Sequence, residues 1–388
     1  MPSAFCRAAR VLAAALLFVS PAFVFAQAMP PPGLPPTPPG TASVLPNSAF
    51  PDLGGPPAPP LPPEQPPPPP QPAPPAPPVD GPMLSPFAGA PWASPTVGHV
   101  PYSVSYRLTW LPDESVRGQD AHFGLVEQDA SVRFPIWQSD HDEVAGTAHV
   151  RAQVIHTGAI LPSTDQPFPD QLWDVRFGAT YRHLFDNGWI AGGSFNFGSA
   201  SNEPFHSINE LTVGLNTFLR VPSGEHNAWL FSLSYSPTGE LSFPVPGVAY
   251  VWVPSDQFRM NVGLPFMVWY RPIEDLTLEA SYMLLTTIHA RATYRVCKPV
   301  RVYLGFDWSN ESWYLVPRPD DKDRLFYYEK RLSVGAQTNI GRTFLLDLST
   351  GYVFDRDYFE GHNSHDSNFN RVDVGNAPLL SFQAQLRW

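Results

Sequence analysis

The stretch LSFQAQLRW at residues 380–388 decides the fold of this chain. Apolar residues stand at every second position of this stretch, and polar residues stand between them. The apolar set is Leu380, Phe382, Ala384, Leu386 and Trp388, and the polar set is Ser381, Gln383, Gln385 and Arg387. Successive side chains of a β-strand point to opposite faces, so the pattern predicts a strand with one apolar and one polar face.

The same two-residue period recurs from residue 99 to the end of the chain. It is clearest at 172–185, 257–271, 274–285 and 298–309. More than a dozen such segments of about 10 to 15 residues are typical of a transmembrane antiparallel up-and-down β-barrel. The sequence therefore predicts an all-β protein that spans a membrane with strands.

Two further features favour a membrane barrel over a soluble sandwich. Aromatic residues gather near the strand ends, as the interfacial girdles of a membrane barrel require; they are Trp110, Trp137, Trp189, Trp229, Trp252, Trp269, Trp308, Trp388, Tyr102, Tyr270, Tyr294 and Phe185. The polar face carries ten arginines, which suit a polar lumen; they are Arg107, Arg133, Arg151, Arg176, Arg182, Arg220, Arg259, Arg291, Arg295 and Arg301.

The number of strands follows from the candidate segments. These are 102–111, 128–138, 143–156, 172–185, 188–198, 206–221, 226–237, 246–253, 257–271, 274–285, 287–296, 298–309, 324–338, 342–356 and 379–388. They number fifteen, whereas a single-chain bacterial barrel has an even number of strands.

Two interpretations restore an even number. The apolar parity runs unbroken through 286–287, so one long strand crosses this point unless the turn there has an odd number of residues. Alternatively, the short segment 246–254 is a loop between prolines. Either interpretation gives fourteen strands, within a range of 12 to 16, and fourteen is our prediction.

The N-terminal third divides into two segments. Arg7 and Arg10 precede a short apolar run, and small or apolar residues follow before Gln27, which predicts a secretory signal peptide at 1–26. Of the 49 prolines, 29 lie between Pro30 and Pro95, so we expect residues 27–98 to be a disordered, extended periplasmic segment. The barrel is expected at 99–388, in the outer membrane of a diderm bacterium.

Five runs in the second half resemble a known family. They are GVAYVWVPSDQFRMNVGLP at 247–265, WYRPIEDLTLEASY at 269–282, ARATYR at 290–295, GFDWSNESWYL at 305–315 and DRLFYYEKRL at 323–332. They resemble a bacterial family of outer-membrane barrels catalogued as a domain of unknown function, mainly over residues 206–388. The resemblance implies a barrel and brings no activity or site residues with it.

The functional prediction concerns the lumen of the barrel. We predict a passive pore for small polar or anionic solutes, because a barrel of this size encloses more space than side chains fill. The predicted pore lining is Arg176, Arg182, Arg259, Glu279, Arg291, Arg295, Arg301 and Asp307. The alternative is a non-conducting structural barrel that anchors the Pro-rich segment as a tether, and a third hypothesis is an outer-membrane hydrolase.

We find no catalytic or metal-binding motif in the sequence that supports the third hypothesis. His362 and His365 lie in a polar loop with no third ligand at a fixed spacing, which we interpret as solvated histidines. Asp320, Asp321 and Asp323 form a group that would suit Ca²⁺, or that would bridge lipopolysaccharide, but ordinary loop charge explains them. We therefore predict no enzyme activity, no metal and no cofactor.

Partners are expected at the membrane and in the periplasm. Phe382, Leu386 and Trp388 resemble the insertion signal that the barrel-assembly machinery reads. Lipid and lipopolysaccharide would surround the barrel, and the Pro-rich segment would contact the cell wall or a periplasmic protein. The formal net charge of −11 argues against a nucleic-acid partner.

Overall fold

The computed structural model describes residues 94, 96–236, 243–283, 287–318, 320–363 and 369–388. The predicted signal peptide and the Pro-rich segment up to residue 93 lie outside the described residues. Among the residues described, no helix is long and apolar enough to cross a membrane.

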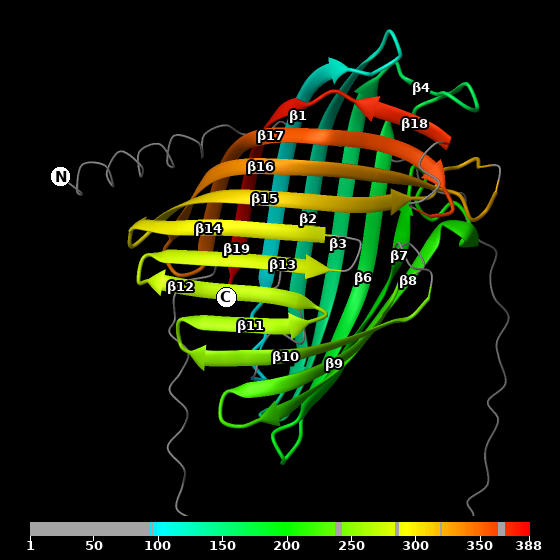
Figure 1. Cartoon of the computed structure of the whole chain (residues 1–388). Coiled ribbons are helices and arrows are strands. Elements are labelled where there is room, and N and C mark those ends of the chain that lie inside the picture. The colour runs from blue at the N-terminus through cyan, green and yellow to red at the C-terminus, as the bar shows by residue number, and fades with distance from the viewer. Residues whose placement is uncertain (1–93, 95, 237–242, 284–286, 319, 364–368) are drawn as a thin grey trace, which may run out of the picture. The chain divides into compact units, whose positions relative to one another are not determined.

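Antiparallel strands make up most of the described chain (Figure 1). Their bounds are β1 Ser103–Ser115, β2 His122–Gln138, β3 Asp142–Thr157, β4 Ile160–Leu161, β5 Gln166–Pro167, β6 Gln171–Leu184, β7 Ile190–Ser201, β8 Leu211–Ser223, β9 Asn227–Tyr235, β10 Val245–Ser255, β11 Phe258–Gly263, β12 Phe266–Ile273, β13 Leu276–Met283, β14 Thr287–Cys297, β15 Val300–Trp313, β16 Arg324–Ile340, β17 Phe344–Gly361, β18 Phe369–Val374 and β19 Ala377–Arg387. A short 3-10 helix, η1 Ile208–Glu210, precedes β8.

Sixteen of these strands close into a barrel. They pair in the order β1, β2, β3, β6 to β17 and β19, and β19 pairs back with β1. Strand β18 pairs with β17 outside this ring, and β4 pairs with β5 in a separate hairpin. Closure leaves no open edge, so the backbone polar groups of each barrel strand find partners on both sides.

The predicted number of fourteen strands is wrong, and hairpin register explains the error. Met260 pairs with Val268 across β11 and β12, and Leu278 pairs with Ala292 across β13 and β14. Both hairpins join even-numbered residues, so an odd number of residues separates each pair. Apolar residues therefore stay at even-numbered positions on both sides of the turn. In the sequence, such a hairpin shows the same alternation as one long strand.

Segment 257–271, which we predicted as one strand, contains such a hairpin. Its turn lies at 264–265, directly after Gly263, whose φ of 129° favours glycine. A Cβ atom at Gly263 would lie 2.1 Å from the carbonyl oxygen of Val248 on β10. Both interpretations that gave fourteen strands are also wrong. Strands β13 and β14 are separate, and β10 is a regular strand of the barrel.

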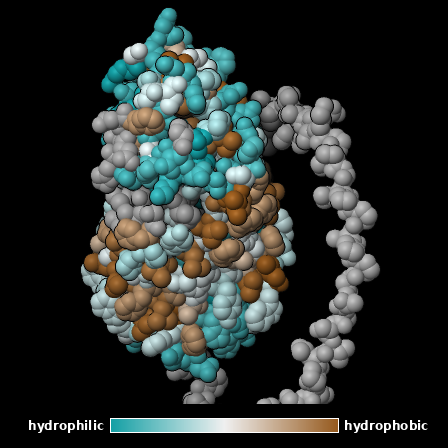
Figure 2. All heavy atoms as spheres, turned by 90° about the vertical axis from the view of Figure 1, so that its right-hand side faces the viewer, coloured by the Kyte–Doolittle hydropathy of each residue, from teal (hydrophilic) through white to brown (hydrophobic). Residues whose placement is uncertain are grey.

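The outer face of the barrel is apolar. Phe177 on β6 is 52% exposed, and Leu304 on β15 and Leu380 on β19 are also exposed. Hydrophobic side chains gather over the body of one face, below a hydrophilic upper end (Figure 2). A closed barrel with an apolar outer face requires lipid around it, and such barrels belong to the bacterial outer membrane. The chain is therefore an outer-membrane β-barrel.

The two ends of the barrel differ in their connections. At the end where β19 terminates, neighbouring strands are joined by short turns such as 139–141, 224–226 and 298–299. At the opposite end the connections include 158–170 and 202–210. Short periplasmic turns and longer external loops are usual in this architecture. We name the two ends the periplasmic end and the external end accordingly.

The barrel wall is taller on one side than on the other. Strands β2, β3, β16 and β17 have 16 to 18 residues each, whereas β11, β12 and β13 have 6 to 8. At about 3.3 Å per residue, the tall strands extend far beyond the short ones. The extra length lies at the external end, where it brings additional inward-facing side chains over the lumen.

The seam between β1 and β19 gives a first prediction. Tyr102 and Trp388 exchange two backbone hydrogen bonds of 3.1 Å, and their rings stack with centroids 5.8 Å apart. We expect Trp388→Ala to remove about 0.5–1.5 kcal/mol of aromatic pairing and to lower the temperature at which the folded band is lost in heated gel electrophoresis. Trp388→Phe keeps a ring and should lose less; equal losses would contradict a role for the stack.

Candidate functional site

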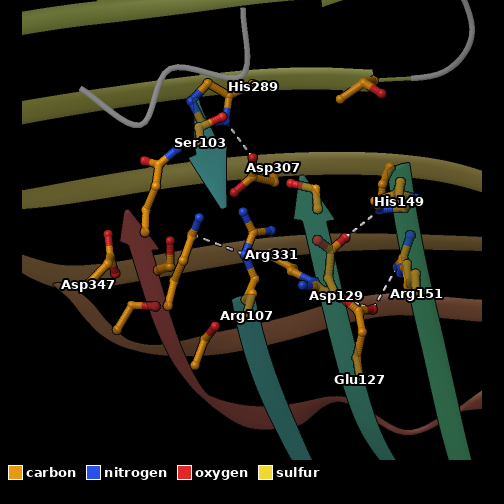
Figure 3. A pocket seen from close by; sticks show the side chains of 18 of the residues that line it. Ser103, Arg107, Glu127, Asp129, His149, Arg151, His289, Asp307, Arg331 and Asp347 are labelled. Atoms are coloured by element: carbon orange, nitrogen blue, oxygen red, sulfur yellow. Dashed lines mark hydrogen bonds and ion pairs between the residues drawn. The ribbon is translucent and has the colours of Figure 1, made fainter. Parts of the chain in front are cut away.

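A polar cavity of about 620 Å³ occupies the lumen. Its lining comes from β19, β1, β2, β3 and Thr180 of β6 on one side and from β14 to β17 on the other (Figure 3). It reaches from Ser103 and Arg387 near the periplasmic end to Glu311 and Glu329 nearer the external end. The cavity is the feature of the described residues that a solute would enter.

Formal charges in the cavity lining balance. Six arginines line it, namely Arg107, Arg133, Arg151, Arg291, Arg331 and Arg387. Six carboxylates line it as well, namely Glu127, Asp129, Asp307, Glu311, Glu329 and Asp347. Opposite charges close together offset the large penalty of removing each one from bulk water.

Ion pairs tie opposite walls of the lumen together. Arg151 on β3 pairs with Glu127 on neighbouring β2 at 2.6 Å and with Glu311 on β15, which is not a neighbour of β3. Arg331 on β16 lies 3.5 Å from Glu127 and also pairs with Glu329 on its own strand. The network thus crosses the lumen at the external end of the cavity.

Two histidine–aspartate pairs also line the cavity (Figure 3). Nε2 of His149 lies 3.0 Å from Oδ2 of Asp129, across the β2–β3 pair. Nδ1 of His289 lies 2.5 Å from Oδ1 of Asp307, across the β14–β15 pair. Both pairs join side chains on adjacent strands, so the sheet register fixes their geometry.

A third polar group lies on the wall between β14 and β17. The hydroxyl of Tyr303 donates to Oδ1 of Asp347 at 2.8 Å, and Gln337 donates to the other carboxylate oxygen at 2.8 Å. The guanidinium of Arg291 lies 3.8 Å from the centre of the Tyr303 ring, a cation–π contact. These contacts fix the position of Arg291 over the cavity.

Above the cavity, an apolar cluster fills the external end of the lumen. This external plug comprises Leu111, Val116, Phe123, Leu125, Ile155, Ala159, Leu161, Phe168, Leu172, Ala200, Trp313, Leu315, Leu325, Tyr327, Val353, Tyr358, Val372, Val374, Ala377 and Leu379. Its members come from strands on opposite sides of the barrel and from the β3–β6 connection, so they meet across the lumen.

The β4–β5 hairpin contributes to the external plug from a loop. Its neighbour Phe168 packs against the rings of Phe123 and Tyr358, with centroids 5.3 Å and 5.0 Å away. The same loop is tied to β18, because Ser163 and Asn370 exchange hydrogen bonds of 2.7 Å and 3.1 Å. The loop is therefore held over the lumen by the apolar contacts of Phe168 and by the hydrogen bonds of Ser163.

A second external loop crosses to the opposite wall. Asn202 beyond β7 exchanges side-chain hydrogen bonds with the backbone of Val316 at 3.0 Å and 2.8 Å. Arg318 lies 3.3 Å from Glu210 in η1. Burial of Glu210 opposes ionisation, but hydrogen bonds from Ser207 and the charge of Arg318 outweigh it and lower the pKa of Glu210.

At the periplasmic end, the segment before β1 enters the lumen. We call described residues 94 and 96–100 the N-terminal latch. Arg182 on β6 donates to the carbonyl oxygens of Ser94 and Thr96 at 2.7 Å and 2.8 Å, and it pairs with Glu143 at 2.9 Å. Glu143 in turn accepts from the backbone N–H of Gly98 at 2.9 Å.

The N-terminal latch also makes apolar contacts. Val97 is buried in a cluster with inward-facing residues of four strands, namely Ile190, Phe218, Ala228, Leu230, Ala249 and Val251. Gly98 has φ 86°, and a Cβ atom there would lie 2.3 Å from the carbonyl oxygen of Ser139. The latch therefore fits tightly against the periplasmic ends of β2, β3 and β6 to β10.

The predicted pore-lining residues fall into three groups. Arg291 and Asp307 line the cavity, and Glu279 is the register partner of Arg291 on β13. Arg182 holds the N-terminal latch, and Arg259 lies on β11 of the low wall.

The other three predicted residues are likewise absent from the cavity lining, which contains only Arg291 and Asp307 of the eight. Arg176 pairs with Asp174 on its own strand. Arg295 binds Asp275 and Glu274 in the periplasmic turn before β13. Arg301 is buried on β15 near the same end.

Sequence reasoning missed the external plug and the cross-lumen ion pairs. Inward-facing Phe123 and Leu125 lie in the part of β2 before residue 128, where our predicted strand began. This stretch has apolar residues on both faces, so the two-residue alternation is not visible there. Apolar residues on the inward face were nevertheless the available signal that the lumen is filled. Nothing in the spacing pointed to Arg151–Glu311, whose partners are 160 residues apart.

The acidic loop residues sit beside a histidine. Nε2 of His362 lies 3.4 Å from Asp320 and 3.1 Å from Asp323. The backbone N–H of Lys322 donates to Asp320 and lowers the pKa of that carboxyl. Within the described part of the chain, no group of three His, Cys, Asp or Glu side chains is arranged to hold a metal ion. His365 lies outside the described residues.

Comparison with known proteins yields structural likenesses of low similarity. An outer-membrane channel from Pseudomonas putida F1 matches with 10% identity and a TM-score of 0.34, covering 76% of this chain and 98% of that one. OccK7 of Pseudomonas aeruginosa matches with 9% identity and a TM-score of 0.34, covering 74% of this chain and 100% of that one.

The β domain of the Bordetella autotransporter BrkA matches with 11% identity and a TM-score of 0.29, covering 74% of this chain and 99% of that one. No family model and no curated protein matches the chain.

Loss of the Arg182 guanidinium gives a second prediction. We expect Arg182→Ala to lower the free energy of unfolding by about 3–5 kcal/mol, because it leaves Glu143 buried without its ion-pair partner. Urea unfolding in lipid vesicles, followed by tryptophan fluorescence, measures the change. Arg295→Ala is the matched control, since its acidic partners are exposed in a turn and the loss should stay below about 1 kcal/mol. Equal losses would contradict the latch.

Proposed function

We propose that this barrel is a passive outer-membrane channel for small polar or anionic solutes, closed at its external end in the conformation described. The observation that carries the proposal is the polar cavity of about 620 Å³ inside the barrel. Its lining of arginines, carboxylates and hydroxyls would replace part of the hydration shell of a polar solute. No catalytic step and no cofactor enters this proposal.

An arc of arginines on the periplasmic side supports a preference for anions. Arg182 lies within electrostatic range of Arg133 and of Arg220, and Arg220 lies within range of Arg259. Glu143 is the carboxylate that acts on Arg133 and Arg182. Solutes that approach from the periplasm would therefore meet a positive field before they reach the balanced cavity.

The external plug supports a channel that opens transiently. Phe123, Tyr327 and Tyr358 are fully buried where the lumen would otherwise continue outward. Phe168 and its loop are attached to the plug through contacts rather than through the barrel's backbone ladder. Displacement of this loop would withdraw Ala159, Leu161 and Phe168 from the plug and loosen it without breaking a barrel strand.

A second candidate is a non-conducting barrel that anchors the Pro-rich segment. The cross-lumen pairs Arg151–Glu311 and Arg331–Glu127 favour it, because they stiffen the barrel and would have to separate before large solutes pass. Under either candidate, the Pro-rich segment would contact the cell wall or a periplasmic protein. Kinship with the outer-membrane family of unknown function also remains a proposal.

Single-channel recording of the full mature chain in a planar bilayer tests the channel. We expect brief openings for the natural sequence and a several-fold higher open probability for Phe168→Ser, which removes a ring from the external plug. Ile160→Ser is the control on the same hairpin, because Ile160 is 42% exposed and lies outside the plug. Silence from chain shown to be inserted, for both the natural sequence and Phe168→Ser, would leave the anchor.

Ion selectivity in the same recordings tests the role of the lining. Arg291→Ala should lower the ratio of chloride to potassium permeability, because it leaves Glu279 and the cavity carboxylates in excess. Arg295→Ala should leave the ratio unchanged, since Arg295 binds turn residues away from the cavity. If both variants shift the ratio equally, the cavity is not the selectivity filter.

A further inference from the structure

Because the fixed charges of the cavity lining balance, the charge state of its two histidines has a large effect on its net charge. The arginine and carboxylate groups of the lining are equal in number, so their formal charges cancel. Histidine is the side chain whose charge ordinarily changes between pH 5 and pH 8. In a balanced cavity, the protonation of His149 and His289 therefore decides the sign of the net charge.

His149 faces the cavity from the β2–β3 side. Its side chain is 29% exposed, and it lies 3.0 Å from Asp129. Across the β3–β6 pair, its register partner is Arg176. Arg107 and Arg151 are the further charged groups whose electrostatic field reaches Asp129. A proton gained by His149 adds positive charge to the cavity.

His289 faces the cavity from the β14–β15 side. It lies 2.5 Å from Asp307, and Ser281 on β13 is its other register partner. Arg331 and Arg291 also act on Asp307. Glu279 on β13 is the further carboxylate within electrostatic range of His289. A proton gained here likewise adds positive charge, on the wall opposite His149.

We propose that His149 and His289 set a pH-dependent ion selectivity, making the cavity attractive to anions in acid. Protonation of both imidazoles adds two positive charges to a lining whose arginine and carboxylate charges otherwise cancel. The arginines stay charged between about pH 5 and pH 8, and any carboxylate that protonates in acid shifts the cavity in the same direction. The inference depends on the channel proposed above.

Removal of the two histidines separates their contribution from that of the carboxylates. Glutamine keeps polar atoms and similar volume but does not titrate, so His149→Gln with His289→Gln should remove the component of selectivity that titrates between pH 5 and 8. His156→Gln is the matched control on β3. His156 has a side chain 92% exposed and lies outside the cavity lining.

The test is the reversal potential of the full chain in a potassium chloride gradient, recorded at pH 8 and at pH 5. For the natural sequence and for His156→Gln, we expect the chloride-to-potassium permeability ratio to rise at least about threefold on acidification, since fixed charges in a narrow lumen create potentials of several kT. The double variant should match the natural ratio at pH 8 and rise markedly less at pH 5.

Three results would overturn the proposal in distinguishable ways. A ratio that does not change with pH, in channels that open normally, would show that the histidines do not set selectivity. A double variant with the full natural pH dependence would assign the effect to the carboxylates. Absence of current from inserted chain would overturn the channel itself, and this inference with it.

Discussion

Closure of the sheet is the constraint on which the rest of the structure depends. In lipid, no water is present to satisfy the backbone, so the strand edges must pair with one another. The seam of β1 with β19 provides that pairing, and Tyr102 and Trp388 stack at its periplasmic end. Closure also forces every inward-facing side chain of sixteen strands into one shared lumen, where each must find a partner or a place in the packing.

The lumen meets this demand differently at different depths. Aromatic and aliphatic side chains fill the external end, ion pairs cross the lumen beneath them, and a polar cavity follows toward the periplasm. The ordering has a physical basis. Tyr327 of the plug donates a hydrogen bond to Glu329 of the ion-pair network, which joins the two layers. The N-terminal latch covers inward-facing apolar residues that would otherwise meet water.

Much of the fold follows from the sequence because strand period is a local property. Alternation identified the strands and placed Arg291 and Asp307 on the inward face. It failed where the period carried no information: the hairpin at Gly263 preserves parity, and Phe123 and Leu125 are apolar although they face inward. Cross-lumen pairing depends on how the ring folds around the lumen, and residues far apart in the chain supply it, so spacing could not reveal it.

Side-specific labelling of a cavity cysteine tests the central claim that the polar cavity is closed to the exterior. Ser333→Cys places a thiol in the cavity lining, and Ile208→Cys places one on the external surface, where Ile208 is 80% exposed. With the natural sequence as background, we predict that a membrane-impermeant thiol reagent added to intact cells labels residue 208 and not 333. Labelling of 333 from outside, as fast as that of 208, would contradict the account.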